Sequence, residues 1–177
     1  MDVWARLDAL PHVAEPPNAK AAVLVPLYED PDGVRVVLTK RPETMRTHPG
    51  DVVFPGGQLE DGEGPIQAAM REAWEEISLP EQSVTEVLGG LTPVTTRNIN
   101  RLIIPVVVRI DRPAELVPDH REVDAIIEPT LAEMLDDDLW HTEDWMGHTL
   151  WFYEFGEGTL WGATAFMMRE LLGYLRD

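Results

Sequence analysis

The sequence predicts an α+β fold, in which helices form layers around a mixed β-sheet. Three observations favour this fold: β-like runs precede one amphipathic helical segment, further β-like runs follow it, and a second long helical pattern closes the chain. The chain has 177 residues, no internal repeat and no linker-like segment. Residues 1–177 are therefore expected to form one domain.

The first part of the chain is expected to form a short helix and three strands. The helix is an amphipathic segment at residues 2–10. The strand-like runs are residues 21–28, 34–39 and 51–54. A Glu-Asp-Pro-Asp-Gly turn at residues 29–33 joins the first two runs, so they should form a hairpin. The third run leads into Pro55-Gly56-Gly57.

The central helix is expected to begin near Pro65 and to end near Ile77. The fixed φ of proline suits a first helical position, and Pro80 follows the expected end. Later strands are expected at residues 84–91, 102–110, 122–127 and 150–155. Helices are expected at residues 130–135 and 161–175. The aromatic residues expected to pack in the core are Phe54, Trp74 and Trp161.

The central helix separates apolar side chains from acidic ones. Its apolar residues at helical spacing are Ile66, Ala69, Met70, Ala73, Trp74 and Ile77. The carboxylates of Glu72, Glu75 and Glu76 gather on a neighbouring edge. Like charges at this spacing destabilise a helix by roughly 0.2–0.5 kcal/mol per pair. A hard divalent cation would relieve that repulsion, and a solvated acidic face is the alternative interpretation.

Composition excludes several kinds of protein. The absence of cysteine excludes disulfides and thiolate metal sites and favours a cytoplasmic location. A net charge of −18 disfavours binding to duplex nucleic acid. The N-terminal residues lack the pattern of a signal peptide, and the longest apolar run, residues 102–108, is too short to span a membrane. We therefore expect neither a nucleic-acid nor a membrane partner.

Residues 57–79 carry a long spaced pattern. This segment resembles the signature of the Nudix hydrolase family, G-x5-E-x7-R-E-U-x-E-E-x-G-U, where U is a bulky aliphatic residue. The matching residues are Gly57, Glu63, Arg71, Glu72, Glu75, Glu76 and Leu79. Two positions depart from the signature: Ala73 is small, and Ser78 replaces a glycine that would supply a left-handed conformation at the end of the helix.

The resemblance implies an α/β/α sandwich and a metal-dependent pyrophosphatase. The cation would be Mg²⁺ or Mn²⁺, and the implied ligands are Glu72, Glu75, Glu76 and the carbonyl group of Gly57. Arg71 cannot bind a cation, and its expected role is to orient a glutamate ligand or to pair with Glu63. The residue that accepts the proton of the attacking water is expected to be Glu72, with Glu122 as a weaker candidate.

Residues 38–57 resemble a further motif, that of the coenzyme A pyrophosphatases: L-L-T-x-R-S-x-x-L-R-x-H-x-G-Q-V-x-F-P-G-G. The matches include Thr39, Arg41, Arg46, His48, Gly50, Val52, Phe54, Pro55, Gly56 and Gly57, and the departures are Pro42, Met45 and Asp51. Residues 160–165, Leu-Trp-Gly-Ala-Thr-Ala, are similar to the I-W-G-x-T-A segment of the same subfamily. The resemblance implies hydrolysis of coenzyme A to 4′-phosphopantetheine and 3′,5′-ADP.

Basic residues, which are scarce in this chain, cluster just before the central helix. Arg41, Arg46 and His48 are candidate contacts to the substrate's phosphates, with salt bridges or a loop-bracing role as the alternatives. Asp51 makes another small-molecule substrate derived from a nucleotide, such as ADP-ribose, a second hypothesis. A non-catalytic Nudix-like binding module is a third. The sequence leaves open whether the protein is a monomer or a homodimer.

Overall fold

The computed structural model describes residues 2–96 and 101–176. Its main sheet is mixed, because the long strands β1 (Ala19–Asp30) and β8 (Arg101–Ile110) pair in parallel while their other neighbours pair antiparallel. The order is β2-β1-β8-β6, in which β2 is Gly33–Val36 and β6 is Val84–Gly90. Two short strands extend it: β5 (Gly56–Gln58) pairs with β1, and β7 (Val94–Thr96) pairs with β8.

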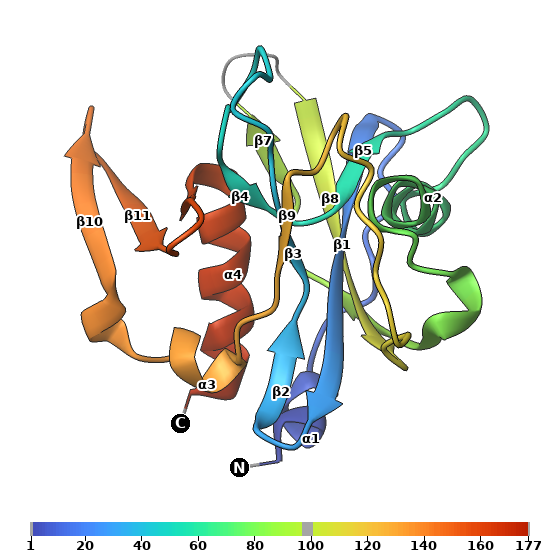
Figure 1. The fold of residues 1–177 in the computed structure, drawn as a ribbon, viewed down its shortest axis with the longest axis horizontal. Helices are drawn as coiled ribbons and strands as arrows, with labels where there is room; N and C mark the ends of the chain where they lie inside the picture. The colour runs from blue at the N-terminus through green and yellow to red at the C-terminus, as the bar shows by residue number, and fades with distance from the viewer. Residues whose placement is uncertain (1, 97–100, 177) are drawn as a thin grey trace.

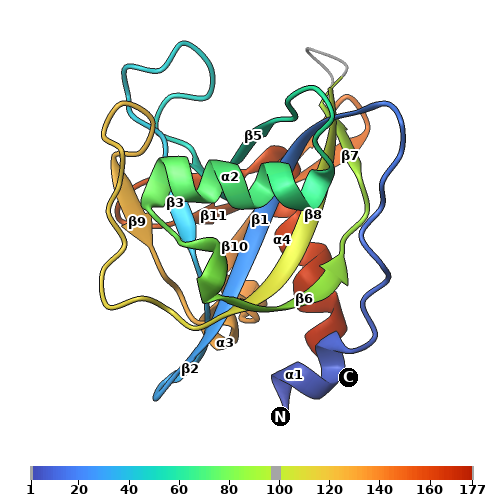
Figure 2. The ribbon, with the colours of Figure 1, turned by 90° about the vertical axis from the view of Figure 1, so that its right-hand side faces the viewer.

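Helices cover both faces of this sheet. Along β1, Ala22 and Leu24 belong to the core that contains helix α2 (Pro65–Ile77), whereas Val25 and Leu27 belong to the core that contains helix α4 (Gly162–Leu175). The alternation follows from the two-residue period of a strand that is buried on both faces. Figure 2 shows α2 in front of β1 and β8, with α4 behind them. The α/β/α sandwich around a mixed sheet is thus confirmed.

Two smaller sheets complete the fold. The first has the order β4-β3-β9, with β4 at Val52–Val53, β3 at Leu38–Lys40 and β9 at Ala125–Ile127. The second has the order β10-β11-β12, with β10 at Trp140–Trp145, β11 at His148–Glu154 and β12 at Thr159–Trp161. The remaining elements are α1 (Val3–Leu7), α3 (Leu131–Met134), and the 3₁₀ turns η1 (Glu81–Ser83) and η2 (Asp137–Leu139). No helix in the described ranges is long and apolar enough to cross a membrane.

Most expected elements are present, and the differences have physical causes. Helix α2 has the bounds expected from its flanking prolines. The expected strand 34–39 is divided into β2 and β3, because Val37 instead bonds to the carbonyl of Pro26. The expected strand 122–127 begins only at Ala125. Strands β5, β7, β10 and β12 were not expected from the sequence, since each is short, glycine-rich or mostly polar.

The prediction that Trp74 packs in the core is wrong. Its side chain is 55% exposed, whereas Phe54 is buried as expected and Trp161 is partly buried. The residues that α2 buries are Pro65, Ala68, Ala69, Ala73 and Ile77. Small alanine side chains let the helix lie close to the sheet, and this rotation turns Trp74 toward solvent.

Candidate functional site

The close packing of α2 against β1 and β5 places glycine backbone beside two carboxylates. A Cβ atom added to Gly57 would lie 2.4 Å from the carboxyl carbon of Glu72, so a side chain at this position would displace that carboxylate. The N–H group of Gly56 donates to Glu76 Oε2 at 3.4 Å. The glycines of β5 therefore form one wall of the site. Glu72 occupies the space that a side chain at Gly57 would fill, and a side chain at Gly56 would meet Ala22 and Val23 of β1.

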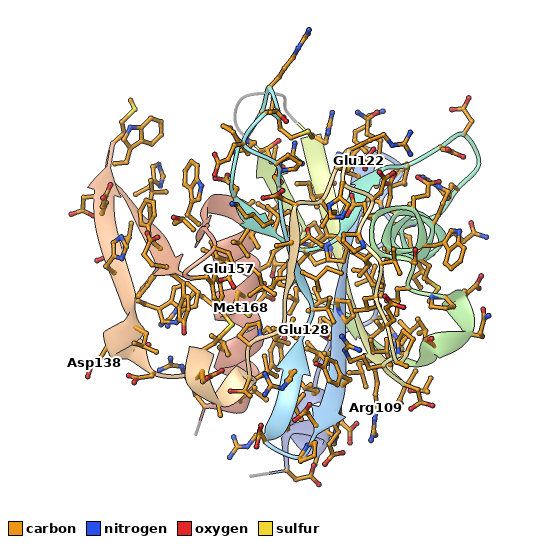
Figure 3. The ribbon with its side chains drawn as sticks, in the orientation of Figure 1. Arg109, Glu122, Glu128, Asp138, Glu157 and Met168 are labelled. Carbon is orange, nitrogen blue, oxygen red and sulfur yellow. The ribbon has the colours of Figure 1, made fainter. Side chains whose placement is uncertain are left out.

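A third carboxylate reaches this site from a distant loop. The N–H groups of Val117 and Asp119 donate to the carbonyl oxygens of Ile77 and Glu76 at 3.0 and 2.8 Å. These bonds satisfy carbonyl groups that the last turn of a helix leaves without partners, and they hold the loop against α2. Glu122 follows in the same loop, and Figure 3 shows it on the α2 side of the molecule.

The three carboxylates form a compact group. Among the described residues, Glu72, Glu76 and Glu122 each offer an oxygen atom, and these oxygens lie within 4.8 Å of one another. Burial raises the pKa of Glu76 to about 8, and the neighbouring charges of Glu72 and Glu122 add to this effect. The pKa of Glu72 is also raised, chiefly by burial, although Arg71 opposes the change. Gathering three like charges is unfavourable unless a cation or a proton offsets them.

A hard divalent cation fits this donor set. Mg²⁺ and Mn²⁺ prefer carboxylate oxygens as ligands. The group offers three such ligands, and one of them, Glu122, is exposed to solvent. A cation would also neutralise the repulsion from Glu72 and Glu122 that adds to the effect of burial on the pKa of Glu76. Glu72, Glu76 and Glu122 are thus the residues that would hold it.

Arg71 links the neighbouring acidic residues. Its guanidinium donates to both carboxylate oxygens of Glu63 at 2.9 and 3.0 Å, to Glu72 Oε1 at 2.9 Å, and to the carbonyl of Gln58 at 2.8 Å. The hydrogen bond from Arg71 is the main cause that lowers the pKa of Glu63. Such a fixed network restricts the rotamer of Glu72. Glu75, a ligand candidate from the sequence, lies outside the group of three and 3.4 Å from Arg71 Nη1.

The predicted substrate contacts lie on one loop, residues 41–51. Arg41 is near the carboxylates, since its charge acts to lower the pKa of Glu76, and its guanidinium donates to the carbonyl of Thr47 at 3.0 and 3.2 Å. Arg46 is exposed. His48 is 57% exposed, and its Nδ1 lies 3.2 Å from a carboxylate oxygen of Asp51. The structure thus brings Arg41 to the site and leaves Arg46 and His48 open to solvent on the same loop.

Sequence reasoning gave Glu122 only a minor role. No spacing in the sequence relates it to the central helix, because its position depends on the backbone bonds between its loop and the end of α2. The one available signal was its expected location at the start of a strand. That strand begins later, and Glu122 lies in the preceding loop.

The fold and the site together define a class of protein: α/β/α sandwich proteins whose central helix carries carboxylates suited to a divalent cation. Comparison with known proteins identifies the family. The family model described as NUDIX domain matches residues 18–147, so the chain belongs to the Nudix family. Nudix hydrolases cleave nucleoside diphosphate derivatives and generally use divalent metal ions.

Named relatives support this membership. The chain is 39% identical over 158 residues to Nudix hydrolase 22, chloroplastic, of Arabidopsis thaliana, a match that covers 82% of this chain and 52% of the relative. It is 35% identical over 159 residues to the uncharacterized Nudix hydrolase NudL of Photorhabdus laumondii, covering 87% of this chain and 83% of the relative. The chain thus spans about half of the plant relative and most of the bacterial one.

Solved structures share the fold. A Nudix hydrolase from M. smegmatis, RenU, superimposes with a TM-score of 0.54 at 25% identity, covering 67% of this chain and 74% of that chain. A NUDIX hydrolase from Alicyclobacillus acidocaldarius gives a TM-score of 0.59 at 18% identity, covering 90% and 93% of the two chains. At 18% identity, the similarity to the Alicyclobacillus acidocaldarius protein supports only a shared fold.

Proposed function

We propose that this protein hydrolyses the diphosphate bond of coenzyme A or its derivatives, with Mg²⁺ or Mn²⁺, to give 3′,5′-ADP and 4′-phosphopantetheine or its acyl form. The observation that carries the proposal is the group of Glu72, Glu76 and Glu122 oxygens within 4.8 Å, at the edge of an open loop with basic residues. When bound, the cation would neutralise diphosphate charge and increase the acidity of a coordinated water.

The residues of the chain have separate tasks in this proposal. Glu72, Glu76 and Glu122 hold the cation, and the carbonyl of Gly57 and the carboxylate of Glu75 remain candidate ligands. Arg71 fixes the position of Glu72 through the hydrogen bonds that it shares between Glu72 and Glu63. Either Glu72 or Glu122 accepts a proton from the attacking water, since both belong to the group of three carboxylates.

The choice of coenzyme A depends on the loop of residues 41–51. Coenzyme A carries a ribose phosphate besides its diphosphate, so it needs cationic groups at some distance from the bound cation. Arg46 and His48 are exposed on the loop that Arg41 places near the carboxylates, and they are suited to that second phosphate. The resemblance of residues 38–57 and 160–165 to the coenzyme A pyrophosphatases supports the same substrate.

One observation favours a second candidate, another nucleoside diphosphate derivative such as ADP-ribose. Asp51 replaces the glutamine of the coenzyme A motif, and its carboxylate lies 3.2 Å from His48, where it competes with a substrate phosphate for the imidazole. A protein with His48 engaged in this way would have less attraction for a ribose phosphate.

A substrate panel tests the proposal. Hydrolysis of coenzyme A, acetyl-coenzyme A, dephospho-coenzyme A, ADP-ribose and NADH should be compared at equal concentrations of Mg²⁺ or Mn²⁺, with products identified by mass spectrometry. We expect the highest kcat/KM for coenzyme A or a thioester, and a lower value for dephospho-coenzyme A. A much higher kcat/KM for ADP-ribose or NADH would replace coenzyme A by the second candidate. Binding without any hydrolysis would instead indicate a non-catalytic module.

A further inference from the structure

Aromatic side chains form a row across the outer face of the sheet β10-β11-β12 (Figure 1). His141, Phe152 and Trp161 are cross-strand neighbours in its register. The rings of His141 and Phe152 are 5.1 Å apart and 8° from parallel. Those of Phe152 and Trp161 are 5.8 Å apart and 4° from parallel. The residues of the opposite face that are buried in the core with α4 are Trp140, Tyr153 and Leu160.

The loop of residues 41–51 borders the last ring of this row. Strand β12 pairs with β11 on one edge, and on the other edge Thr159 of β12 forms a parallel bridge with Asp51 of the loop. Strand β4, which follows the loop, also lies against β12. Because Phe152 stacks on Trp161 from the β11 side, the second face of the indole is turned toward the loop.

The side chain of His48 covers this second face only in part. Its ring lies 6.1 Å from the Trp161 ring and is tilted by 53°, so it does not continue the parallel stack. His48 is exposed, and its contact with Asp51 is at the rim of the loop, so its side chain can turn aside. Phe152 meanwhile holds the indole from behind, and a ring fixed in this way needs little ordering when a ligand binds.

The chemistry of the proposed substrate favours a base at this position. Nucleic-acid bases stack on aromatic side chains, and tryptophan offers a large flat surface. In coenzyme A the same ribose carries the adenine and the ribose phosphate, so the groups that bind them must be neighbours. His48, a candidate for the ribose phosphate, is the neighbour of Trp161. The pantetheine arm has no ring that could continue the row.

We propose that Trp161 is the stacking platform for the adenine base of the substrate, and that Phe152 and His141 hold its indole in position. The diphosphate then extends along the loop, past Arg41, to the carboxylates. The inference rests on the proposed function, because it assigns a place to the adenosine half of that substrate. It applies equally to ADP-ribose, which carries the same adenosine.

Two simple ligands separate the base from the phosphate. AMP and ribose 5-phosphate share the 5′-phosphate, and only AMP has the adenine. In titration calorimetry, wild type should bind AMP at least about tenfold more tightly than ribose 5-phosphate. Trp161→Leu should lose most of that difference without a change for ribose 5-phosphate, and Trp161→Phe should keep part of it. Trp145→Leu, an exposed tryptophan of the same sheet outside the row, is the matched control and should bind like wild type.

Nuclear magnetic resonance tests the contact in wild type itself. The chain has six tryptophans, and the indole N–H signal that is missing in Trp161→Phe is that of Trp161. This signal should shift when AMP is added and stay in place with ribose 5-phosphate. The measurement remains decisive if circular dichroism shows that Trp161→Leu is not folded.

Three results would overturn the inference. They are equal affinities of wild type for AMP and ribose 5-phosphate, undiminished AMP binding by folded Trp161→Leu, and an equal loss for both ligands, which would give Trp161 only a supporting role for the loop. The hydrolysis panel is a separate readout. A preference for ADP-ribose would replace coenzyme A and leave this inference intact, whereas coenzyme A hydrolysis with an unshifted Trp161 signal would contradict this inference alone.

Discussion

The backbone N–H of Asp119 donates a hydrogen bond of 2.8 Å to the carbonyl oxygen of Glu76, the same residue whose side chain lies in the carboxylate group. The end of α2 thereby fixes the loop that carries Glu122. Asp119 also accepts the N–H groups of Glu122 and Val123 through its own carbonyl, at 2.9 and 2.8 Å. Backbone hydrogen bonds thus fix the position of the loop that carries Glu122, the third carboxylate.

Replacement of Glu122 should therefore weaken cation binding and catalysis together. Glu122→Gln keeps the shape of the side chain but removes one charged oxygen donor. We expect at least about a tenfold loss in Mn²⁺ affinity and in kcat. Titration calorimetry with Mn²⁺ and steady-state kinetics provide the measurements. Glu115→Gln, an exposed glutamate in the preceding segment, is the control. Equal Mn²⁺ affinity in wild type and Glu122→Gln would remove Glu122 from the ligand set.

A methyl group at Gly57 should impair activity more than stability. The added Cβ would lie 2.4 Å from the carboxyl carbon of Glu72. The carboxylate can move away because it is the end of a flexible side chain, but it then leaves its position in the cluster. We expect Gly57→Ala to lower kcat on the order of 10²-fold with a small change in midpoint temperature. Gly156→Ala is the control, since no atom lies within 4 Å of its added Cβ. Wild-type kcat in Gly57→Ala would show that the close contact has no catalytic role.

The parts of the fold that local chemistry determines could be predicted from the sequence. Pro65 and Pro80 mark the limits of α2, and the spacing between them contains the acidic edge. The face that α2 buries was less predictable. Two faces of α2 have apolar residues at helical spacing, one centred on the alanines and one that includes Trp74. The contact with β1 determines that the alanine face is buried.

The parts that depend on distant contacts could not be predicted. Strand β5 is Gly-Gly-Gln, which has no strand pattern, and it forms because β1 provides a partner. The grouping of the three carboxylates likewise depends on contacts between distant parts of the chain. Helical spacing relates Glu72 to Glu75 and Glu76 alike. The loop bound to the end of α2 brings Glu122 close to Glu72 and Glu76, whereas Glu75 lies beside Arg71, outside the group.

Removal of the charge at Glu76 should stabilise the metal-free protein while abolishing its function. Glu76 is partly buried beside two other carboxylates, so its ionised form is unfavourable without a cation. In the presence of EDTA, Glu76→Gln should raise the free energy of unfolding by about 1–3 kcal/mol. Added Mn²⁺ should stabilise wild type strongly and the variant little. Urea denaturation with and without Mn²⁺ measures both effects, with exposed Glu86→Gln as the control. Lower stability of the variant in EDTA would contradict this argument.

Glu128 should make the protein sensitive to acid. Burial acts to raise the pKa of Glu128, but the guanidinium of Arg112 and the hydroxyl of Tyr28 outweigh it and leave the pKa below its ordinary value of 4.5. Arg112 Nη2 donates to Glu128 at 2.9 Å, and Tyr28 donates at 3.0 Å. The stability from this lowered pKa is fully present above pH 4.5 and is lost as the pH falls through the folded-state pKa.

Replacement of Glu128 tests this pH dependence. At neutral pH, Glu128→Gln should lower the free energy of unfolding by about 1–3 kcal/mol. Below pH 4.5 the difference between variant and wild type should shrink, because wild type loses the same contribution there. Denaturant curves at a series of pH values measure it, with exposed Glu157→Gln as the control. A difference that stays constant down to strongly acidic pH would show that the ion pair is not responsible.

Ser78 holds a backbone conformation that suits glycine. It follows the last residue of α2 with φ 55° and ψ 36°, in the left-handed region, where the Nudix signature has glycine. In this region, a residue with a Cβ is destabilised by about 1–2 kcal/mol of conformational free energy. Glycine instead destabilises the folded state by roughly 0.5–1 kcal/mol, because it has greater freedom in the unfolded chain. Ser78→Gly should therefore raise the free energy of unfolding by up to about 1 kcal/mol. The control Ser83→Gly lies in the η1 turn and should lower it or leave it unchanged. Thermal and urea denaturation measure both variants, and destabilisation by Ser78→Gly would mean that the serine side chain makes a stabilising contact that outweighs its strain.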